Sequence, residues 1–404
     1  MSGSRRVTLM AENASVTPLE LFFDLVFVYA FTQVTALMAT DVSLKGVVVG
    51  LVVLTLVWWQ WVGYCWLGNL ARADEGLTRY VFLIVMSTMF VLALSVPESF
   101  ADRSGGLDAP VVVVVCLVVV RLSHLLLFAA AGRGDPALLH QLAMWTPTLL
   151  GAVALLFAGA LLGDPWQLPL WLSALVVDLG GTVAIGAKGW VVQSASHFSE
   201  RHGLVVIIAL GESIVAIGVG VTDLPISIPV IVASTLGILL VGMLWWVYFD
   251  VTALVGEHRL ATTTDREERA ALARDAYSLL HLPLIAGIVI MALGLKKAFE
   301  YIGGEEGHSW RDPQSGLAAY VLPWGVALFL LGHVAFRHRI GDAVPLPCLL
   351  AVGILVFGGL VMTTLSSLVA LAAVTAVMVA LVLYEAVARR DHRREVRSAA
   401  QAHA

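Results

Sequence analysis

Charged residues are scarce in this chain. Lysine, arginine, aspartate and glutamate together make up 13% of its 404 residues, and hydrophobic residues make up 59%. A typical soluble domain carries about 25% charged residues. A surface that faces water needs those charges, whereas a surface that faces lipid cannot tolerate them. The composition therefore predicts an integral membrane protein and excludes a soluble enzyme.

Several chemical signatures are also missing. The three cysteines lie in apolar stretches, and their spacing matches neither a metal site nor a disulfide framework. The chain has no G-x-x-x-x-G-K-[ST] phosphate loop, no G-x-S-x-G elbow and no selectivity-filter sequence. We therefore do not expect ATP-driven transport by this chain alone. No basic tract suited to nucleic acid occurs outside the C-terminus, so we expect membrane lipids and an unidentified small molecule or ion as partners. No cofactor is expected, although a bound metal ion stays open.

Long apolar runs follow one another along the chain. A helix needs about 20 apolar residues to cross a hydrocarbon core of ~30 Å. The polar start runs directly into a full-length apolar span, so we expect a transmembrane helix there rather than a cleavable signal peptide. The predicted fold is an all-α bundle of about twelve spans, near 18–40, 44–68, 79–97, 109–131, 140–162, 168–192, 203–222, 226–251, 276–299, 315–336, 344–361 and 364–388.

Positive charges set the predicted orientation. With the loops assigned alternately, 18 of the 24 Lys and Arg residues fall on the side of the N-terminus. Arg5 and Arg6 count toward that side, and Arg103 counts toward the other. Because cytoplasmic loops carry the excess of Lys and Arg, both termini are predicted to be cytoplasmic. The basic cluster at 389–397 fits a stop signal that rests on anionic headgroups.

Three pairs of short segments recur in the same order in the two halves of the chain. Residues 25–33 resemble residues 204–212, and the Trp58-Trp59 pair is matched by Trp245-Trp246. Leu122-Ser-His124 is matched by Leu331-Gly-His333. The order predicts two parallel six-helix repeats, although Val- and Leu-rich segments also align by chance. The predicted organisation is a cytoplasmic segment 1–17, six-helix halves 18–192 and 193–388, and a basic cytoplasmic tail 389–404.

Ionisable side chains lie inside the predicted spans, mostly in their cytoplasmic half. Such groups are costly in a bilayer and usually face a cavity or a partner. The candidate substrate- or ion-binding residues are Glu20, Asp24, Arg121, His124, Asp178, Glu212, Asp250, His281 and His333. Glu20 and Asp24 are four residues apart and share one helix face, so one of them should hold a proton or both should meet a cation. The alternative is structural pairing, for example of Asp24 with Arg121.

The segment 197–203 is predicted to close a cytoplasmic loop before the helix that begins at residue 203. His197 and Glu200 could bind a metal together, or Ser199 or Glu200 could cap the helix. Tryptophans gather in two of the predicted spans. They fit an interfacial belt or core packing, and the alternative is an aromatic wall that faces a substrate.

Four stretches of the sequence resemble the signatures of the bacterial low temperature requirement A family. They are Thr17–Val28 (TPLELFFDLVFV), Glu200–Ser213 with ERHG and ALGES, Trp245–Asp250 (WWVYFD) and His281–Gly287 (HLPLIAG). The resemblance implies a bacterial inner-membrane protein of many spans and supplies no substrate or reaction. It adds Glu200, Arg201 and His202 as secondary site candidates.

Three functions fit these observations. The first is a secondary transporter coupled to protons or another cation, in which Glu20, Asp24 and Glu212 carry the coupling ion and His124 and His281 relay it. The second is a membrane-embedded metal enzyme that acts on lipid and needs at least three converging ligands. The third is a membrane protein without turnover that serves adaptation to stress or cold.

Overall fold

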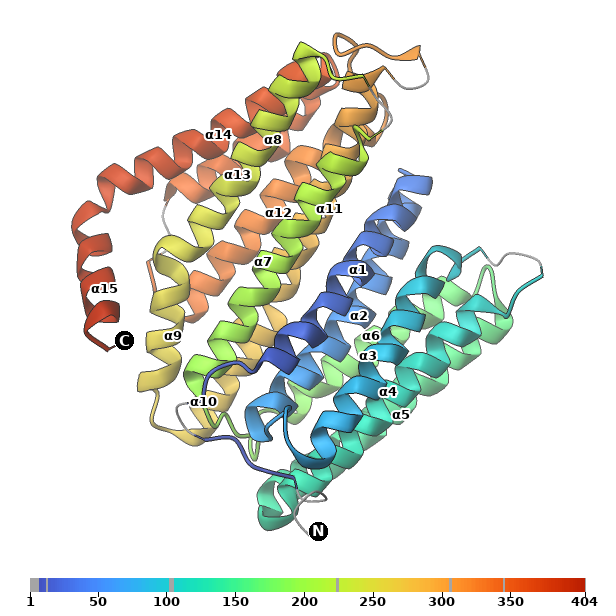
Figure 1. Cartoon of the computed structure of the whole chain (residues 1–404), viewed down its shortest axis with the longest axis vertical. Coiled ribbons are helices and arrows are strands. Elements are labelled where there is room, and N and C mark those ends of the chain that lie inside the picture. The colour runs from blue at the N-terminus through green and yellow to red at the C-terminus, as the bar shows by residue number, and fades with distance from the viewer. Residues whose placement is uncertain are drawn as a thin grey trace. The chain divides into compact units, whose positions relative to one another are not determined.

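The computed structural model describes residues 7–11, 14–101, 105–222, 225–304, 307–343 and 346–403. Arg5, Arg6 and Arg103, which the orientation argument counts, lie outside these ranges. The described residues form helices and no strand (Figure 1). The helices are α1 Pro18–Thr40, α2 Leu44–Leu70, α3 Gly76–Ser95, η1 Val96–Glu98, α4 Ala109–Ala131, η2 Gly132–Gly134, α5 Pro136–Leu162, α6 Gln167–Ile185, α7 Ala195–Val219, α8 Ile228–Val247, η3 Tyr248–Thr252, α9 Ala253–Thr262, α10 Arg266–Leu272, η4 Ala273–Leu279, α11 His281–Gly303, α12 Ala318–Arg339, α13 Leu346–Met362, α14 Ser367–Ala388 and α15 Arg390–His403.

Eleven of the helical segments in the described residues are long and apolar enough to cross a membrane. The count treats α8 to α9 as one segment, 228–262, and α10 to α11 as another, 266–303. Helix α13, with 17 residues, is apolar but shorter than these eleven segments and lies at the short end of the lengths that cross a bilayer. The chain leaves the helical path between Met362 and Ser367, so α13 and α14 are separate helices, divided where Thr363 and Thr364 were expected to divide them.

Three predicted boundaries are wrong, each for a local reason. Helix α6 ends at Ile185 rather than near 192, because Gly186 has φ +85°, a conformation that ends helices. Helix α7 begins at Ala195 rather than near 203, because the Ser194 hydroxyl accepts a hydrogen bond of 3.2 Å from the His197 amide. The predicted loop at 252–275 is mostly helical, so Arg259 and Arg266 lie on helices.

Two short π-helical segments join neighbouring helices, α8 to α9 and α10 to α11. One covers Tyr248–Thr252 and the other Ala273–Leu279. Hydropathy could not reveal them, because a polar helical turn and a polar loop have the same average hydropathy. Single π turns inside α-helices occur frequently at functional sites.

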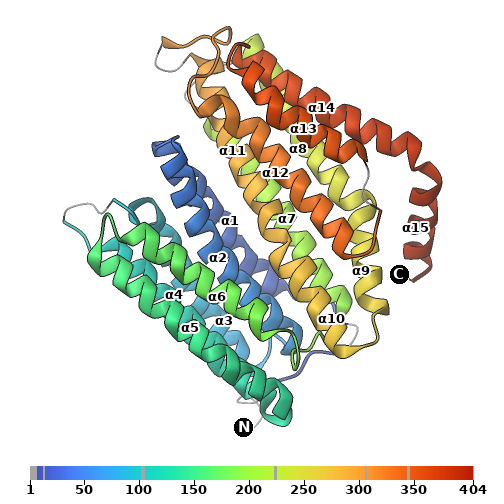
Figure 2. The same ribbon diagram turned by 180° about the vertical axis from the view of Figure 1, so that it is seen from behind.

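The chain divides into two compact units. The first contains Met1–Leu37, Lys45–Arg201 and Leu260–Ser278, and the second contains Met38–Leu44, His202–Arg259 and Leu279–Ala404. In the first unit α3 packs on α4, α4 on α5, and α5 on α6, and these helices lie side by side in both views (Figures 1 and 2). In the second unit α11 packs on α12, α12 on α13, and α8 on α14.

Glycines allow α11 and α12 to approach closely. A Cβ atom added at Gly294 would lie 2.5 Å from the backbone Cα of Leu322, and one at Gly332 would lie 2.9 Å from the amide nitrogen of Leu284. Small residues at such contacts let helices in lipid gain dispersion energy, because lipid supplies no hydrophobic force between helices.

We predict that Gly294→Ala destabilises the protein by about 1–3 kcal/mol, because the added methyl group meets backbone that cannot move aside. Gly353→Ala in α13 is the matched control, since a Cβ there has no described neighbour within 4 Å. Thermal unfolding in detergent measures the difference. Equal melting temperatures for the two variants would contradict the tight α11–α12 contact.

A second prediction concerns the start of α5. Asp135 caps this helix by accepting hydrogen bonds from the amides of Ala137 and Leu138, and it pairs with the Arg266 guanidinium at 2.5 Å. The hydrogen bond from Arg266 holds the pKa of the Asp135 carboxyl below its ordinary value of 3.8. Because the folded-state pKa is lowered, its stabilising effect is present above pH 3.8 and is lost as the pH falls through the folded-state value.

Asp135→Asn keeps an N-cap but removes the charge. We expect its melting temperature to fall below that of the wild type at pH 7, and the gap to narrow as the pH is lowered below about 4. Arg266→Gln should lose the same pH-dependent part of the stability. A gap that stays constant with pH would mean that the ion pair contributes nothing.

Candidate functional site

The strongest polar network in the first unit starts at the N-terminus of α1. Thr17 is the residue before the helix, Pro18 occupies its first position and Glu20 follows in its first turn. The amide and the hydroxyl of Thr17 donate to Glu20 Oε2 at 2.9 and 3.0 Å, and the Glu20 amide donates to the Thr17 hydroxyl at 3.4 Å. This reciprocal pairing is a capping box. It fixes the Glu20 carboxylate at a position that is fully buried.

Arg201 of α7 joins the two carboxylates of α1. Its Nη1 atom lies 2.7 Å from Glu20 Oε1, and its Nη2 atom lies 2.7 Å from Asp24 Oδ1. All three side chains are at most 1% exposed. The two carboxylates therefore meet a cation, which is one of the two alternatives that their spacing predicted, and that cation is a guanidinium. Structural pairing of Asp24 with Arg121 was wrong, because Arg121 lies against Asp178.

Helix α2 shapes the other side of the network. Trp61 Nε1 donates to Asp24 Oδ1 at 2.9 Å, and the Trp61 ring lies 5.7 Å from the Arg201 guanidinium carbon. Gly68 faces Glu20, and a Cβ atom at this position would collide with Glu20 Oε1. The small residue leaves room for the carboxylate between the helices.

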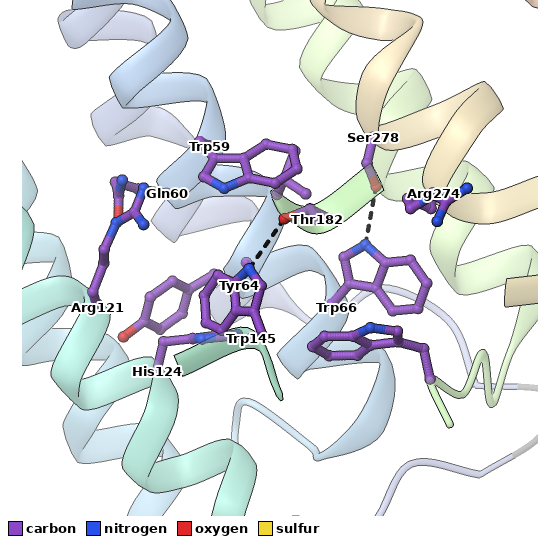
Figure 3. A pocket seen from close by; sticks show the side chains of 13 residues that line it. Trp59, Gln60, Tyr64, Trp66, Arg121, His124, Trp145, Thr182, Arg274 and Ser278 are labelled. Carbon is purple, nitrogen blue, oxygen red and sulfur yellow. Dashed lines mark hydrogen bonds between the residues drawn. The ribbon is translucent and has the colours of Figure 1, made fainter. Parts of the chain in front are cut away.

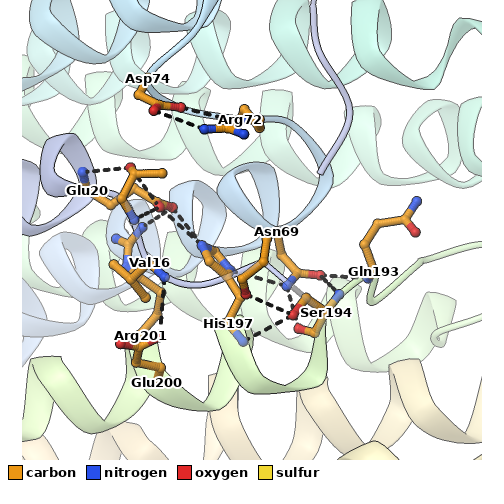
Figure 4. Close-up of polar contacts among 12 residues, drawn as sticks. Val16, Glu20, Asn69, Arg72, Asp74, Gln193, Ser194, His197, Glu200 and Arg201 are labelled. Carbon is orange, nitrogen blue, oxygen red and sulfur yellow. Dashed lines mark hydrogen bonds and ion pairs between the residues drawn. The ribbon is translucent and has the colours of Figure 1, made fainter. Parts of the chain in front are cut away.

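His197 of α7 completes the network, and Asn69 of α2 determines its tautomer (Figure 4). Asn69 Oδ1 accepts from the Gln193 amide at 2.7 Å, so the Asn69 NH₂ group must face Ser194 O and His197 Nδ1, at 2.7 and 3.2 Å. His197 Nδ1 therefore accepts a hydrogen bond, and the ring proton sits on Nε2. Nε2 donates to the Glu20 carboxylate oxygens at 3.0 and 3.1 Å, and His197 is neutral in this arrangement.

The formal charges of this network do not balance. Two carboxylates face one guanidinium and a neutral imidazole, which leaves one negative charge inside the membrane-spanning helices. Asp24 Oδ2 is buried and has no hydrogen-bond partner among the described residues. An unbalanced buried charge is costly, and a proton on a carboxyl group removes it. Asp24 Oδ2 is therefore the position in this network that can accept a proton.

Two further predicted residues of the first unit form a separate pair. Arg121 of α4 forms an ion pair with Asp178 of α6, and both side chains are at most 5% exposed. His124, one turn after Arg121, is buried and its ring packs against Tyr64 and Trp145. Arg121 and His124 line a cavity with several tryptophans (Figure 3).

The predicted residues of the second unit do not form one cluster. His281 Nε2 lies 2.8 Å from the Tyr248 hydroxyl, and its ring is 5.2 Å from that of His202. His333 Nε2 lies 3.0 Å from the Thr252 hydroxyl. Asp250 pairs with basic residues of α15, and Glu212 is 2% exposed in α7. Tyr248, Thr252 and Asp250 all belong to the π-helical segment η3.

Metal ligation of this network finds no support in the described part of the chain. No group of three or more His, Cys, Asp or Glu residues is placed there to hold a metal ion. The structure does not favour a metal shared by His197 and Glu200. The His197 ring bonds to Glu20, and Glu200 Oε2 accepts a hydrogen bond from the Val16 amide at 3.2 Å. Ser194, rather than Ser199 or Glu200, caps α7.

Sequence reasoning did not select His197, Asn69 or Trp61 as site residues. His197 was considered only as a metal ligand in a loop, and Asn69 sits in a tryptophan-rich span that reads as apolar. A signal was available for Asn69, because an amide in an apolar helix needs partners.

The charge imbalance predicts a specific rescue. Arg201→Met leaves two buried carboxylates without their guanidinium and should cost about 3–5 kcal/mol of stability, with loss of monodisperse protein in detergent. The double variant Arg201→Met with Asp24→Asn should recover part of that loss, because it removes one negative charge together with the positive charge. Size-exclusion profiles and melting temperatures of both variants test this. A double variant no better than the single one would contradict the shared ion pair.

The chain resembles known proteins over most of its length. The family model described as "Bacterial low temperature requirement A protein (LtrA)" matches residues 15–383. A protein of Rhizobium meliloti (strain 1021), named "Uncharacterized protein RA0937", is 29% identical over 284 residues, which cover 68% of this chain and 67% of that protein. No solved structure matches the chain. The match begins just before the capping box of α1 and includes the whole network, and the chain belongs to the bacterial low temperature requirement A family.

Proposed function

We propose that this protein is a proton-coupled secondary transporter in which Asp24 carries the coupling proton. The observation that supports the proposal is the charge imbalance at Arg201: two buried carboxylates, one guanidinium and a neutral histidine. Ionisable groups at such positions in membrane proteins commonly belong to proton relays. Glu20 is the less suitable carrier, because its carboxylate already accepts from Thr17, His197 and Arg201.

The wider topology is part of the same proposal. The protein crosses the bacterial inner membrane about twelve times, with both termini in the cytoplasm and lipids around its exposed apolar side chains. A similar ion pair in each unit supports the proposal of two parallel repeats. An arginine of α4 pairs with a carboxylate of α6 in the first unit, and Arg337 of α12 pairs with Glu385 of α14 in the second at 3.1 Å. Glu212 in the second unit is the second candidate for carrying a coupling ion.

A proton on Asp24 can be detected without knowing the substrate. Infrared difference spectra between high and low pH should contain the carbonyl stretch of a protonated buried carboxyl group in the wild type. Asp24→Asn should lose this band. Asp164→Asn is the matched control, since the Asp164 side chain is 85% exposed. A band that persists in Asp24→Asn would assign the proton elsewhere.

Transport itself is tested in liposomes that contain a trapped pH-sensitive dye. We expect addition of a pooled small-molecule extract of bacterial cells to change the internal pH with wild-type protein and with Asp164→Asn, but not with Asp24→Asn. Loss of the response in Asp24→Asn, with unchanged folding in detergent, supports coupling. An equal response in all three samples overturns the proposal.

A further inference from the structure

The first unit contains an aromatic cavity that the proton network does not use. Its walls include Trp59, Tyr64, Trp66, Trp145 and Trp190, from α2, α5 and the segment before α7 (Figure 3). The space open to the centre of a water-sized molecule is about 70 Å³. One water needs on the order of 10–15 Å³ by this measure. The cavity therefore has room for several waters or for one small molecule. The covalently bonded atoms of such a molecule pack more closely than separate waters do.

Most polar groups around the cavity already have partners. The Tyr64 hydroxyl donates to Val120 O at 3.1 Å, and Gln60 Nε2 donates to Leu56 O at 3.1 Å. The Thr182 hydroxyl donates to Asp178 O at 2.9 Å, and the Ser278 hydroxyl donates to Ala273 O at 3.5 Å. These hydroxyl and amide donors are committed to the protein itself.

The guanidinium groups still have free N–H donors. Arg121, which is 5% exposed, pairs with Asp178, yet its Nε atom has no hydrogen-bond partner in the described chain. Arg274 directs Nε and Nη2 to Asp275, at 2.8 and 2.7 Å, and its buried Nη1 atom likewise lacks a partner among the described residues. A buried donor without an acceptor is costly, so both positions favour a ligand that supplies acceptor atoms.

The charges around the cavity decide the sign of the ligand. Aromatic walls alone would also suit a cation. Here two guanidiniums line the cavity, and the carboxylates beside them, Asp178 and Asp275, are already occupied by ion pairs. A cation would meet two positive groups and no carboxylate among the residues that line the cavity. An anion would accept charge-assisted hydrogen bonds, which are shorter and stronger than neutral ones.

We propose that this cavity binds a small aromatic monocarboxylate, with its ring among the tryptophans and its carboxylate on one of the two guanidinium groups, which lie on opposite sides of the cavity (Figure 3). A single ring with one carboxylate matches the available space and the flat walls. As a transported substrate this ligand rests on the proposed function, but its binding in the cavity does not.

Calorimetric titration of the detergent-purified full-length protein tests the site, with sodium benzoate as the probe. Benzamide and benzylamine have nearly the same shape but are neutral and cationic. We expect saturable binding of benzoate and binding at least tenfold weaker for the other two. Equal or tighter binding of benzamide or benzylamine overturns the assignment of an anion. Absence of binding by all three overturns the site.

Variants identify the cavity as the place of binding. Arg274→Gln removes the free Nη1 donor and, if Arg274 holds the carboxylate, should weaken benzoate binding by about tenfold or more, the value of one charge-assisted hydrogen bond. Arg311→Gln, in the second unit, is the matched control and should bind as the wild type does. Where Arg121→Gln fails to fold, Arg121→Gln with Asp178→Asn keeps the charges balanced, and it should lose binding if Arg121 holds the carboxylate. Wild-type affinity in both cavity variants overturns the inference.

Uptake of labelled benzoate into proteoliposomes separates this inference from transport. Protein-free liposomes measure passive entry of the acid. Binding in detergent without protein-dependent uptake contradicts transport of this ligand and leaves the site in place. Infrared evidence for the Asp24 proton together with no benzoate binding contradicts the site and leaves the proton carrier in place.

Discussion

The Arg201 guanidinium, held between Glu20 and Asp24, is the interaction on which the first unit depends. A charge inside a bilayer is tolerated only when a partner offsets its desolvation. Each neighbour of the guanidinium reflects this requirement. The capping box of α1 positions Glu20, Gly68 leaves the space that the carboxylate needs, and Trp61 donates to Asp24. Three helices are thereby fixed around one cation.

Helix α2 contributes Trp61 to the ion network and also forms a wall of the aromatic cavity. Trp61 contacts Asp24 and stacks on Trp58, with ring centroids 5.0 Å apart. Trp58 Nε1 donates to the backbone carbonyl of Ser278 at 2.9 Å, and the Ser278 hydroxyl accepts from Trp66 at the cavity. Packed side chains and hydrogen bonds therefore connect the ion network with the aromatic cavity inside the first unit.

Two of the sequence stretches that resemble family signatures lie at the π-helical segments. The WWVYFD stretch ends in η3, and the HLPLIAG stretch begins directly after η4. A π turn widens the helix and leaves a side chain or carbonyl free for other contacts. In η3 the side chains of Tyr248 and Thr252 are free to hydrogen-bond with the buried histidines of α11 and α12. In η4 the carbonyl of Ser278 receives the Trp58 indole.

The sequence by itself determined that the chain is a helical membrane protein and where its buried charges lie along the helices. These properties depend on average hydropathy and on spacing along one helix. Glu20 and Asp24 share a face because they are four residues apart, whatever surrounds them. Only the tertiary structure decided which groups meet. Arg201 and His197 reach α1, and Asn69 reaches His197, through the register between helices. No local pattern in a run of similar apolar residues encodes that register. The polar segments 195–202 and 252–275 were predicted to be loops for the same reason, because only packing against other helices distinguishes a buried polar helix from a loop in water.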